Sequence, residues 1–339
     1  MIILFRAESS PIVGLGHLIR SLFIANTIRN TYPNTEIIFL TGDDASSISK
    51  IQENKFEFII SSAKNEEFFL LSNCINKNVD VLFIDKLYNY STDFILQLSK
   101  YCKVTMFHNL CEGAHLCDAF ILPAIHIHPQ ILNDPKWTNG RVKFYEGIKY
   151  IVLNDKIINL SKSKSAKTNV KIIVITTGGS DPTGVMLKIL GWINKLEIQD
   201  IIVYALIGES FVHNNKLKLL KKELKSYILI KPYNVSYFEI ADIAISTFGV
   251  STYELMFLGL PIMSIGHREQ NAKGSKILSE KYDQLIDLGN IDNLSMEEFN
   301  NTLLKTMKKL KKIRVADCYI DGKGVNRVAE IIYKLGKEV

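Results

Sequence analysis

The chain is poor in cysteine, and its few cysteines follow no functional pattern. Five are present among 339 residues, and no two of them form a C-x-x-C pair. They are Cys74, Cys102, Cys111, Cys117 and Cys318. An odd number at irregular spacing argues against a disulfide framework and is typical of a reducing compartment. We therefore expect a cytoplasmic protein.

Long apolar runs are also absent from the sequence. No run reaches the roughly 18 residues that a membrane-spanning helix requires. The first residues also lack the basic segment that precedes the apolar part of a secretory signal. These absences predict a soluble chain without a membrane span, and a peripheral association with a membrane stays open.

Basic residues outnumber acidic ones, but not in the pattern of a nucleic-acid-binding protein. The formal net charge is +6, and much of the excess lies in lysine-rich stretches at 216–225 and 305–312. Neither stretch has the interleaved aromatic residues of a nucleic-acid surface, so both are interpreted as solvated helix faces. A mildly basic protein is compatible with small anionic substrates.

The chain does contain strand and helix patterns that alternate in two halves, as parallel sheets with crossover helices do. The strand patterns are Ile2–Phe5, Thr35–Leu40, Phe56–Ile60, Val79–Ile84, Lys103–Phe107 and Ala119–Leu122, then Val170–Ile175, Ile201–Ile207, Tyr227–Ile230, Ile243–Ile245 and Pro261–Ile265. A polar linker pattern at 161–169 divides the halves. We predict an α/β protein with two Rossmann-type, doubly wound domains, 1–150 and 170–324, facing a cleft. A C-terminal helix over 325–339 can cross back onto the first domain.

The most informative segment joins the first strand to the first helix, at residues 5–20. Gly14 and Gly16 precede His17 and Arg20 at the opening of the helix. Glycines let a backbone approach a ligand closely, and a helix N-terminus presents free N–H groups to an anion. A histidine, titrating near neutrality when unperturbed, can meet a phosphate or a sugar there. The alternative is a tight turn with a packed histidine. The complete six-residue dinucleotide fingerprint is absent, which disfavours a redox enzyme.

Two further turns in the second half have the composition of a phosphate cradle. One strand runs into T-T-G-G-S-D at 176–181, and another runs into S-T-F-G-V-S-T at 246–252. Both turns supply backbone N–H groups and hydroxyls without bulky side chains, although a plain strand-to-helix connection would use the same residues. Glu254 follows near the start of a helix. Its carboxylate can cap the helix dipole or accept hydrogen bonds from both hydroxyls of a ribose.

These motifs resemble those of known nucleotide-sugar enzymes. The stretch 246–261 is similar to the nucleotide-sugar site of the MurG-like superfamily, whose fold is GT-B. The pattern R-x-E-x-S-x-x-x-G-x-G-H-x-x-R at 6–20 resembles the opening of the PseG family. Members of that family hydrolyse UDP-2,4-diacetamido-2,4,6-trideoxy-β-L-altropyranose in pseudaminic acid synthesis. The resemblance continues through 178–181, 270–271 and 321–327, and so covers most of the chain at motif level.

The resemblance implies an inverting, metal-independent hydrolysis of a UDP-sugar in the cytoplasm. His17 would be the general base that activates a water for attack at the anomeric carbon, with UDP as the leaving group. Ser251 and Thr252 would hold the pyrophosphate, and Glu254 the ribose. The uracil would lie near 232–235.

The implied substrate-binding set extends over both halves. It comprises Arg6, Gly14, Gly16, Arg20, Gly178, Gly179, Ser180, Asp181, Val235, Gly249, Val250, Ser251, Thr252, Glu254, Gln270 and Asn271. Gln270 and Asn271 would face the sugar. No cofactor and no nucleic-acid partner are implied.

The chain departs from the family pattern where the sugar or an acceptor would bind. Lys86 follows Asp85 in place of the usual histidine, and His108 precedes Asn109 where acidic residues are common. A GT-B glycosyltransferase, whose base deprotonates an acceptor hydroxyl instead of water, therefore stays open as an alternative. A non-catalytic nucleotide-sugar-binding protein is a third.

The other histidines give weaker signals. His108 and His115 suit either the sugar pocket or a structural position, and the structural interpretation is preferred. His126 and His128 have the spacing of a metal-binding pair but lack acidic or cysteine partners nearby in the sequence. His267, beside Arg268, suits either a phosphate contact or a structural position.

Overall fold

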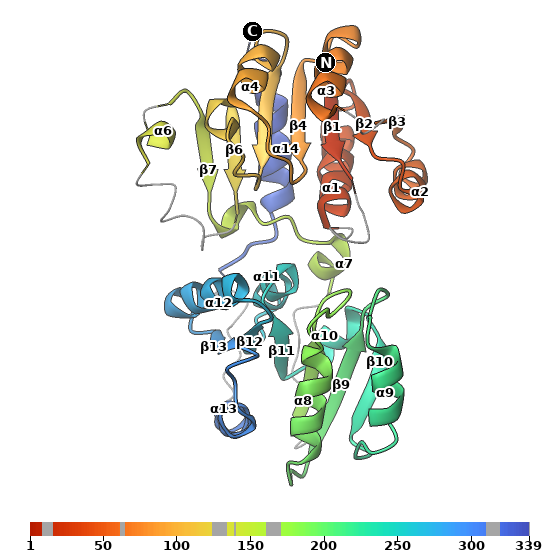
Figure 1. The fold of residues 1–339 in the computed structure, drawn as a ribbon, viewed down its shortest axis with the longest axis vertical. Helices are drawn as coiled ribbons and strands as arrows, with labels where there is room; N and C mark the ends of the chain where they lie inside the picture. The colour runs from red at the N-terminus through yellow and green to blue at the C-terminus, as the bar shows by residue number, and fades with distance from the viewer. Residues whose placement is uncertain are drawn as a thin grey trace. The chain divides into compact units, whose positions relative to one another are not determined.

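A computed structural model of the protein describes residues 1–8, 16–61, 65–123, 134–138, 140–160, 171–309 and 319–338. The chain divides into two compact units, one of residues 1–154 with 322–339 and one of residues 155–321. Each unit contains a single parallel sheet with helices on both faces (Figure 1). The predicted doubly wound α/β class is confirmed.

The first unit has a seven-stranded sheet in the order β3-β2-β1-β4-β5-β6-β7. Its strands are β1 (Ile2–Ala7), β2 (Glu36–Thr41), β3 (Glu57–Ile60), β4 (Val81–Asp85), β5 (Lys103–Phe107), β6 (Ala119–Leu122) and β7 (Lys143–Glu146). Its helices are α1 (Gly16–Thr31), α2 (Ala45–Glu53), α3 (Glu66–Asn76), α4 (Thr92–Leu98), α6 (Pro135–Thr138) and α14 (Gly324–Leu335), with 3-10 turns η1 (Ala114–Leu116) and η2 (Ile148–Tyr150).

The second unit has a six-stranded sheet in the order β10-β9-β8-β11-β12-β13. Its strands are β8 (Lys171–Thr176), β9 (Ile201–Ile207), β10 (Ile228–Pro232), β11 (Ile243–Thr247), β12 (Ile262–Gly266) and β13 (Leu285–Asn290). Its helices are α7 (Asp155–Ile158), α8 (Val185–Asn194), α9 (Asn214–Leu220), α10 (Ser236–Ile240), α11 (Val250–Phe257), α12 (Glu269–Lys281) and α13 (Met296–Lys308).

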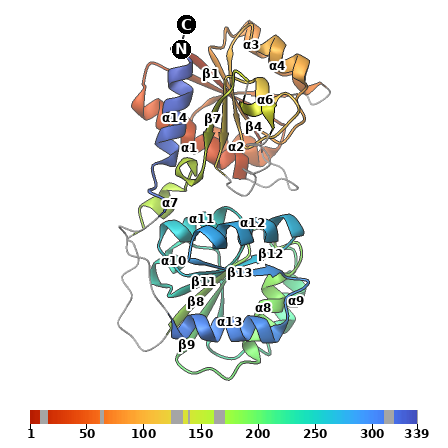
Figure 2. The same cartoon turned by 90° about the vertical axis from the view of Figure 1, so that its left-hand side faces the viewer.

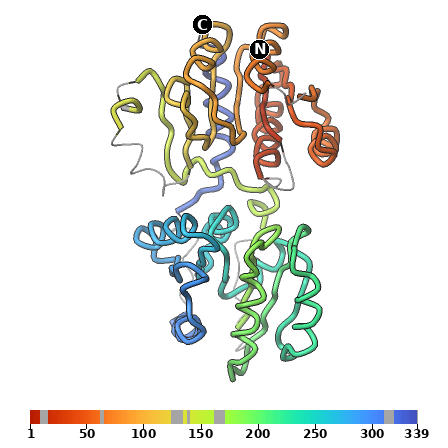
Figure 3. Tube along the Cα trace, in the orientation of Figure 1, coloured from red at the N-terminus to blue at the C-terminus, as the bar shows by residue number. Residues whose placement is uncertain are grey.

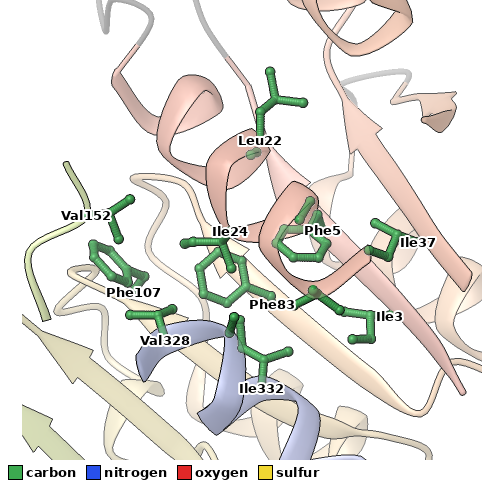
Figure 4. Packing of buried hydrophobic residues seen from close by; sticks show 14 of the residues in the cluster. Ile3, Phe5, Leu22, Ile24, Ile37, Phe83, Phe107, Val152, Val328 and Ile332 are labelled. Atoms are coloured by element: carbon green, nitrogen blue, oxygen red, sulfur yellow. The ribbon is translucent and has the colours of Figure 1, made fainter. Parts of the chain in front are cut away.

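Helix α14 completes the core of the first unit. It packs against α1 (Figure 2), and the trace returns to the unit that holds the N-terminus (Figure 3). Val328 and Ile332 of α14 are fully buried with Phe83 and Ile24 (Figure 4). Burying one such side chain contributes about 1.5–3 kcal/mol. The first unit therefore needs residues from both ends of the chain.

Two strands of the structure have no counterpart among the predicted ones. They are β7 and β13, the outermost strands of one end of each sheet. Each is only half-buried along most of its length, so neither has the continuous apolar run that marks a central parallel strand. Gly14, His126, His128 and the predicted linker at 161–169 lie outside the described residues.

Candidate functional site

Each sheet has one topological switch point, where successive strands are added on opposite sides. In the first unit it lies between β1 and β4, which pair in parallel with Ala7 opposite Asp85. In the second unit it lies between β8 and β11. Ligands of doubly wound proteins bind beyond the carboxyl ends of the strands at such points. Most of the predicted site residues lie at or just beyond these strand ends.

At the first switch point, His17 of α1 is paired with Asp85 at the end of β4. Its Nδ1 atom lies 2.7 Å from Asp85 Oδ1. Asp85 has no exposed surface, whereas His17 is 17% exposed. The histidine ring thus bridges a buried carboxylate and the surface of the unit.

The charge of Asp85 decides which ring nitrogen of His17 carries the proton. Burial by itself would raise the pKa of Asp85, but the Arg20 charge and the hydrogen bonds from His17 and Arg20 outweigh it, so this pKa lies below its ordinary value. An ionised carboxylate can only accept hydrogen bonds. In neutral His17 the proton therefore sits on Nδ1, and Nε2 keeps its lone pair, as a general base requires.

Arg20 and His17 share a face of α1 because they are three residues apart. The Arg20 guanidinium forms a fork on Asp85, with Nε 2.7 Å from Oδ2 and Nη2 2.6 Å from Oδ1. It also lies over the Phe107 ring, 4.5 Å from its centroid. In this structure Arg20 thus contacts the partner of His17, and its contact with substrate stays a prediction.

Arg6, also predicted to bind substrate, lies in a buried ion network. Its side chain is 1% exposed and donates to both oxygens of Glu66, at 2.6 and 2.9 Å, and to Glu8, at 2.7 Å. Lys86 and the Tyr90 hydroxyl also donate to Glu66. Burial opposes ionisation of Glu66, but these partners lower its pKa to about 2. Arg6 therefore serves the fold here, by joining β1 to the first turn of α3.

In the second unit, the loops that follow β8, β11 and β12 lie at one edge, because neighbouring parallel strands end together. The loop after β11 leads into α11, with Gly249 preceding it. The Thr252 hydroxyl accepts a hydrogen bond from Gly249 N, at 3.2 Å. Val250, in the first turn, is 54% exposed. The first turn of α11 thus exposes the Val250 side chain to solvent, while Thr252 is buried.

Glu254 is a buried carboxyl without a cationic partner among the described residues. It is 8% exposed, and burial raises its pKa to about 7, although a hydrogen bond with the Ser251 side chain opposes the shift. The same serine bonds with Tyr233, whose pKa is raised by burial and by the Glu254 charge. Hydrogen bonds donated by a ligand would stabilise the ionised form of such a buried carboxyl.

The conformation of the Gly178–Asp181 turn after β8 is fixed by a glycine at its start and by the hydrogen bonds of Asp181 at its end. Gly178 has a φ of +77°, a conformation that glycine adopts without strain. Asp181 is 1% exposed, and its carboxylate accepts from Val185 N and Met186 N, both at 2.9 Å. Burial nevertheless raises the pKa of Asp181. Asp181 therefore caps α8, while Gly179 and Ser180 keep accessible surface.

Gly208, just after β9, packs closely against this turn. A Cβ at position 208 would clash with the carbonyl oxygens of Gly178 and Gly179. We expect Gly208→Ala to destabilise the second unit by about 1–3 kcal/mol, because the turn must move. The fluorescence of Trp192 during urea unfolding, in a Trp137→Phe background, reports this unit. Gly191→Ala in α8, where a Cβ meets no atom within 4 Å, is the control and should not destabilise.

The remaining predicted residues of the second unit are spread around the same edge. Asn271 donates to the carbonyl of Phe248, at 3.2 Å, which joins the loop after β11 to α12. Gln270 is exposed, and Val235 is half-buried just before α10. Burial and then the Arg268 charge lower the pKa of His267, against the opposing charge of Asp181. His267 and Asp181 therefore interact electrostatically across this edge.

Two histidines of the first unit lie apart from the His17 pair. His115 contacts the Glu112 carbonyl through Nδ1, at 3.0 Å, and lies edge-on to Trp137. His108 follows β5 with a φ of +58°. Gly16 is exposed at the first position of α1, where a Cβ would meet no atom within 4 Å.

Sequence reasoning left Asp85, Glu66 and Tyr233 out of the candidate set. The sequence does mark Asp85 as the acid that ends the apolar strand 79–84, where ligands of such folds bind, but it does not reveal the pairing with His17. Glu66 and Tyr233 carry no such signal, since their partners are distant in the sequence. Among the described residues, no group of three or more His, Cys, Asp or Glu is placed to hold a metal ion. Within that part of the chain, no helix is long and apolar enough to cross a bilayer.

Comparison with curated proteins finds two relatives of low identity. An uncharacterised protein of Methanocaldococcus jannaschii, MJ1062, is 28% identical over 271 residues, which cover 77% of this chain and 55% of that protein. The chain thus spans about half the length of that relative. The spore coat polysaccharide biosynthesis protein SpsG of Bacillus subtilis is 21% identical over 95% of both chains. No protein-family model matches the sequence.

Solved structures identify the fold. MurG of Acinetobacter baumannii matches with a TM-score of 0.68 and 12% identity over 98% of this chain and 99% of that one. MnaA of S. aureus, solved with UDP, matches with a TM-score of 0.61 and 14% identity over 98% and 96%. The fold is GT-B-like, with two Rossmann-type units, as the sequence predicted.

Proposed function

We propose that the chain is a metal-independent hydrolase that releases UDP from a UDP-linked deoxy-diacetamido sugar in the synthesis of a surface glycan. The observation that carries the proposal is the pairing of His17 Nδ1 with buried Asp85, at 2.7 Å. It leaves Nε2 of a partly exposed imidazole as a base. The PseG resemblance of residues 6–20 and the similarity to a polysaccharide biosynthesis protein support the choice of substrate class.

In the proposed reaction His17 Nε2 accepts a proton from water as the water oxygen bonds to the anomeric carbon. The bond from that carbon to the diphosphate oxygen breaks, and its electron pair leaves with UDP. Attack from the face opposite the leaving group inverts the configuration. Asp85 stabilises the imidazolium that forms, because it is held in an ionised state beside Nδ1.

The second unit would bind the nucleotide. We assign the diphosphate to the first turn of α11, where the N–H groups of Val250 and Ser251 are the donors and the helix dipole favours negative charge. The N–H groups of Gly249 and Thr252 are bonded to each other's oxygens and hold the turn in shape. The leaving charge of UDP would be stabilised there. Glu254, one turn further on, would accept hydrogen bonds from the ribose hydroxyls. The similarity to MnaA, which was solved with UDP, supports the choice of UDP as the nucleotide.

The test is incubation of the purified protein with UDP-2,4-diacetamido-2,4,6-trideoxy-β-L-altropyranose in ¹⁸O-labelled water. Mass analysis of both products locates the label. Label in the free sugar, with none in UDP, is the expected result, since water attacks carbon. Label in UDP would mean attack at phosphorus and would reject the mechanism.

A GT-B glycosyltransferase is the second candidate, favoured by the similarity to MurG. His17 would then take the proton of an acceptor hydroxyl. Absence of turnover in water, with UDP release that depends on an added acceptor, would support the transferase and reject the hydrolase.

Glu254→Gln is expected to have opposite effects on binding and stability. UDP affinity should fall by about 1–3 kcal/mol, because a neutral amide replaces a charged acceptor. The ligand-free second unit should become more stable at pH values above about 7. A buried acid whose pKa is raised from 4.5 to about 7 lowers stability as pH rises through that range, and the amide lacks this cost. The expected gain is about 1–3 kcal/mol.

Calorimetric titration with UDP and thermal unfolding, both between about pH 5 and 8, measure these effects. The affinity difference between the wild type and the variant should grow with pH as Glu254 ionises. Glu297→Gln, at an exposed position in the first turn of α13, should change neither quantity. Equal UDP affinity in the wild type and a folded Glu254→Gln variant would reject the ribose contact.

A further inference from the structure

Asp85 is surrounded by hydrogen-bond donors from one helix. His17 Nδ1 and Arg20 Nη2 lie 2.7 and 2.6 Å from Oδ1. Arg20 Nε and the Ser21 hydroxyl lie 2.7 and 3.4 Å from Oδ2. Among the described residues, Arg20 is the cation that balances this fully buried carboxylate.

Without the Arg20 charge, the pair of Asp85 and His17 would take up a proton. A buried carboxylate that faces only a neutral imidazole and a hydroxyl is strongly destabilised. Uptake of a proton relieves this destabilisation, and Asp85 and His17 Nδ1 would then share that proton. Either Asp85 donates and the remaining ring proton shifts to Nε2, or the ring becomes imidazolium. In both states Nε2 carries a proton and is no longer a base.

We propose that Arg20 is a positioning residue that keeps Asp85 acceptor-only and thereby holds the single proton of His17 on Nδ1. The inference rests on the proposed role of His17 as a base, and the contact of Arg20 with substrate stays a separate prediction. The charged groups placed against His17 by the described elements are Asp85 of β4 and Arg20 of α1 itself.

The packing of Arg20 is suited to this role. Its guanidinium lies over Phe107 in a cation–π contact at 4.5 Å, and it is 16% exposed. The fork reaches both carboxylate oxygens, which a single ammonium cannot do in the same geometry. Arg20 Nη2 lies 3.2 Å from His17 Nδ1, but that nitrogen's proton already points to Asp85, so the guanidinium adds charge there without a hydrogen bond.

The test is nitrogen NMR of protein labelled with ¹⁵N-histidine at neutral pH, with the His17 signals assigned by their loss in His17→Gln. The wild type is expected to show Nδ1 protonated and Nε2 unprotonated. Arg20→Gln should show Nε2 protonated, whereas Arg20→Lys should retain an unprotonated Nε2. Arg29→Gln is the control, because Arg29 is also on α1 and stacked on an aromatic ring, that of Phe56, but does not contact Asp85.

An unprotonated Nε2 in folded Arg20→Gln would overturn the proposal, as would a wild type with its proton on Nε2. The turnover number with the UDP-sugar gives a second readout. It should fall at least about tenfold in Arg20→Gln, with UDP affinity unchanged, and stay unchanged in Arg29→Gln. Failure of the wild type to hydrolyse the sugar would reject the proposed function, whereas the NMR result decides the role of Arg20 separately.

Discussion

Replacing His17 by alanine is expected to lower the turnover number by about 10²–10⁴-fold, the range lost with a general base. This loss corresponds to about 3–5 kcal/mol of transition-state stabilisation. His17 lies on the surface side of a buried carboxylate, so its removal deletes the base and leaves the core in place. UDP affinity should be unchanged, because the residues assigned to the nucleotide belong to the other unit.

Steady-state kinetics and calorimetric titration with UDP check this prediction. His115→Ala is the matched control, since His115 is a histidine of the same unit whose contacts are a backbone carbonyl and Trp137. Its turnover should equal that of the wild type. Full turnover in His17→Ala would remove the base from the mechanism and would favour a nucleotide-sugar-binding protein or a base elsewhere.

Replacing Arg6 by methionine is expected to destabilise the first unit by about 3–5 kcal/mol, the cost of breaking a buried ion pair on one side. The Arg6 guanidinium is 1% exposed and donates to both oxygens of Glu66. Methionine fills part of the volume but offers no donor. Lys86 and Tyr90 stay beside Glu66, which places the loss toward the lower end of that range.

The effect of Arg6→Met should depend on pH. The pKa of Glu66 is lowered from 4.5 to about 2 in the folded protein. Its stabilising contribution is therefore present above about pH 4.5 and is lost as pH falls toward about 2. The difference between the wild type and the variant should be largest near neutrality and should shrink below about pH 4.5.

Urea unfolding followed by the fluorescence of Trp137, in a Trp192→Phe background, isolates the first unit. Lys77→Ala is the control, because Lys77 and its partner Glu57 are 41% and 53% exposed, and exposed pairs contribute about 0–1 kcal/mol. A loss in Arg6→Met no larger than in this control would refute the stabilising role of the network and return Arg6 to the candidates for substrate contact.

Periodicity alone was enough to predict most of the strands of both sheets. The runs that became β5, β6 and β9 are predicted with the bounds that the structure gives, because a central parallel strand is apolar on both faces and needs no partner to be recognised. The strands β7 and β13 lie at sheet edges, where one side of the strand is unpaired, and most of their side chains are partly exposed. Their sequences therefore lack the signal.

The candidate site also divides into features that the sequence predicts and features that it does not. The glycine turns and the His17–Arg20 spacing are local patterns, so the sequence places them at helix starts without further information. The partners of those residues are not local. Asp85 is 65 residues from Arg20, and Glu66 is 60 residues from Arg6. Two arginines with the same prediction thus have different partners, one beside the candidate base and one in the fold's interior.

The sequence by itself determined the α/β class, the two doubly wound units and the strand ends at which the candidate residues gather, because these follow from short-range patterns of apolar residues and glycines. Only the tertiary structure decided which charges meet. It paired His17 and Arg20 with Asp85, enclosed Arg6 with Glu66, and left Glu254 buried with no cation beside it among the described residues. The physical reason is that the ionisation of a buried group depends on its partners in space, and these come from strands and helices far apart in the chain.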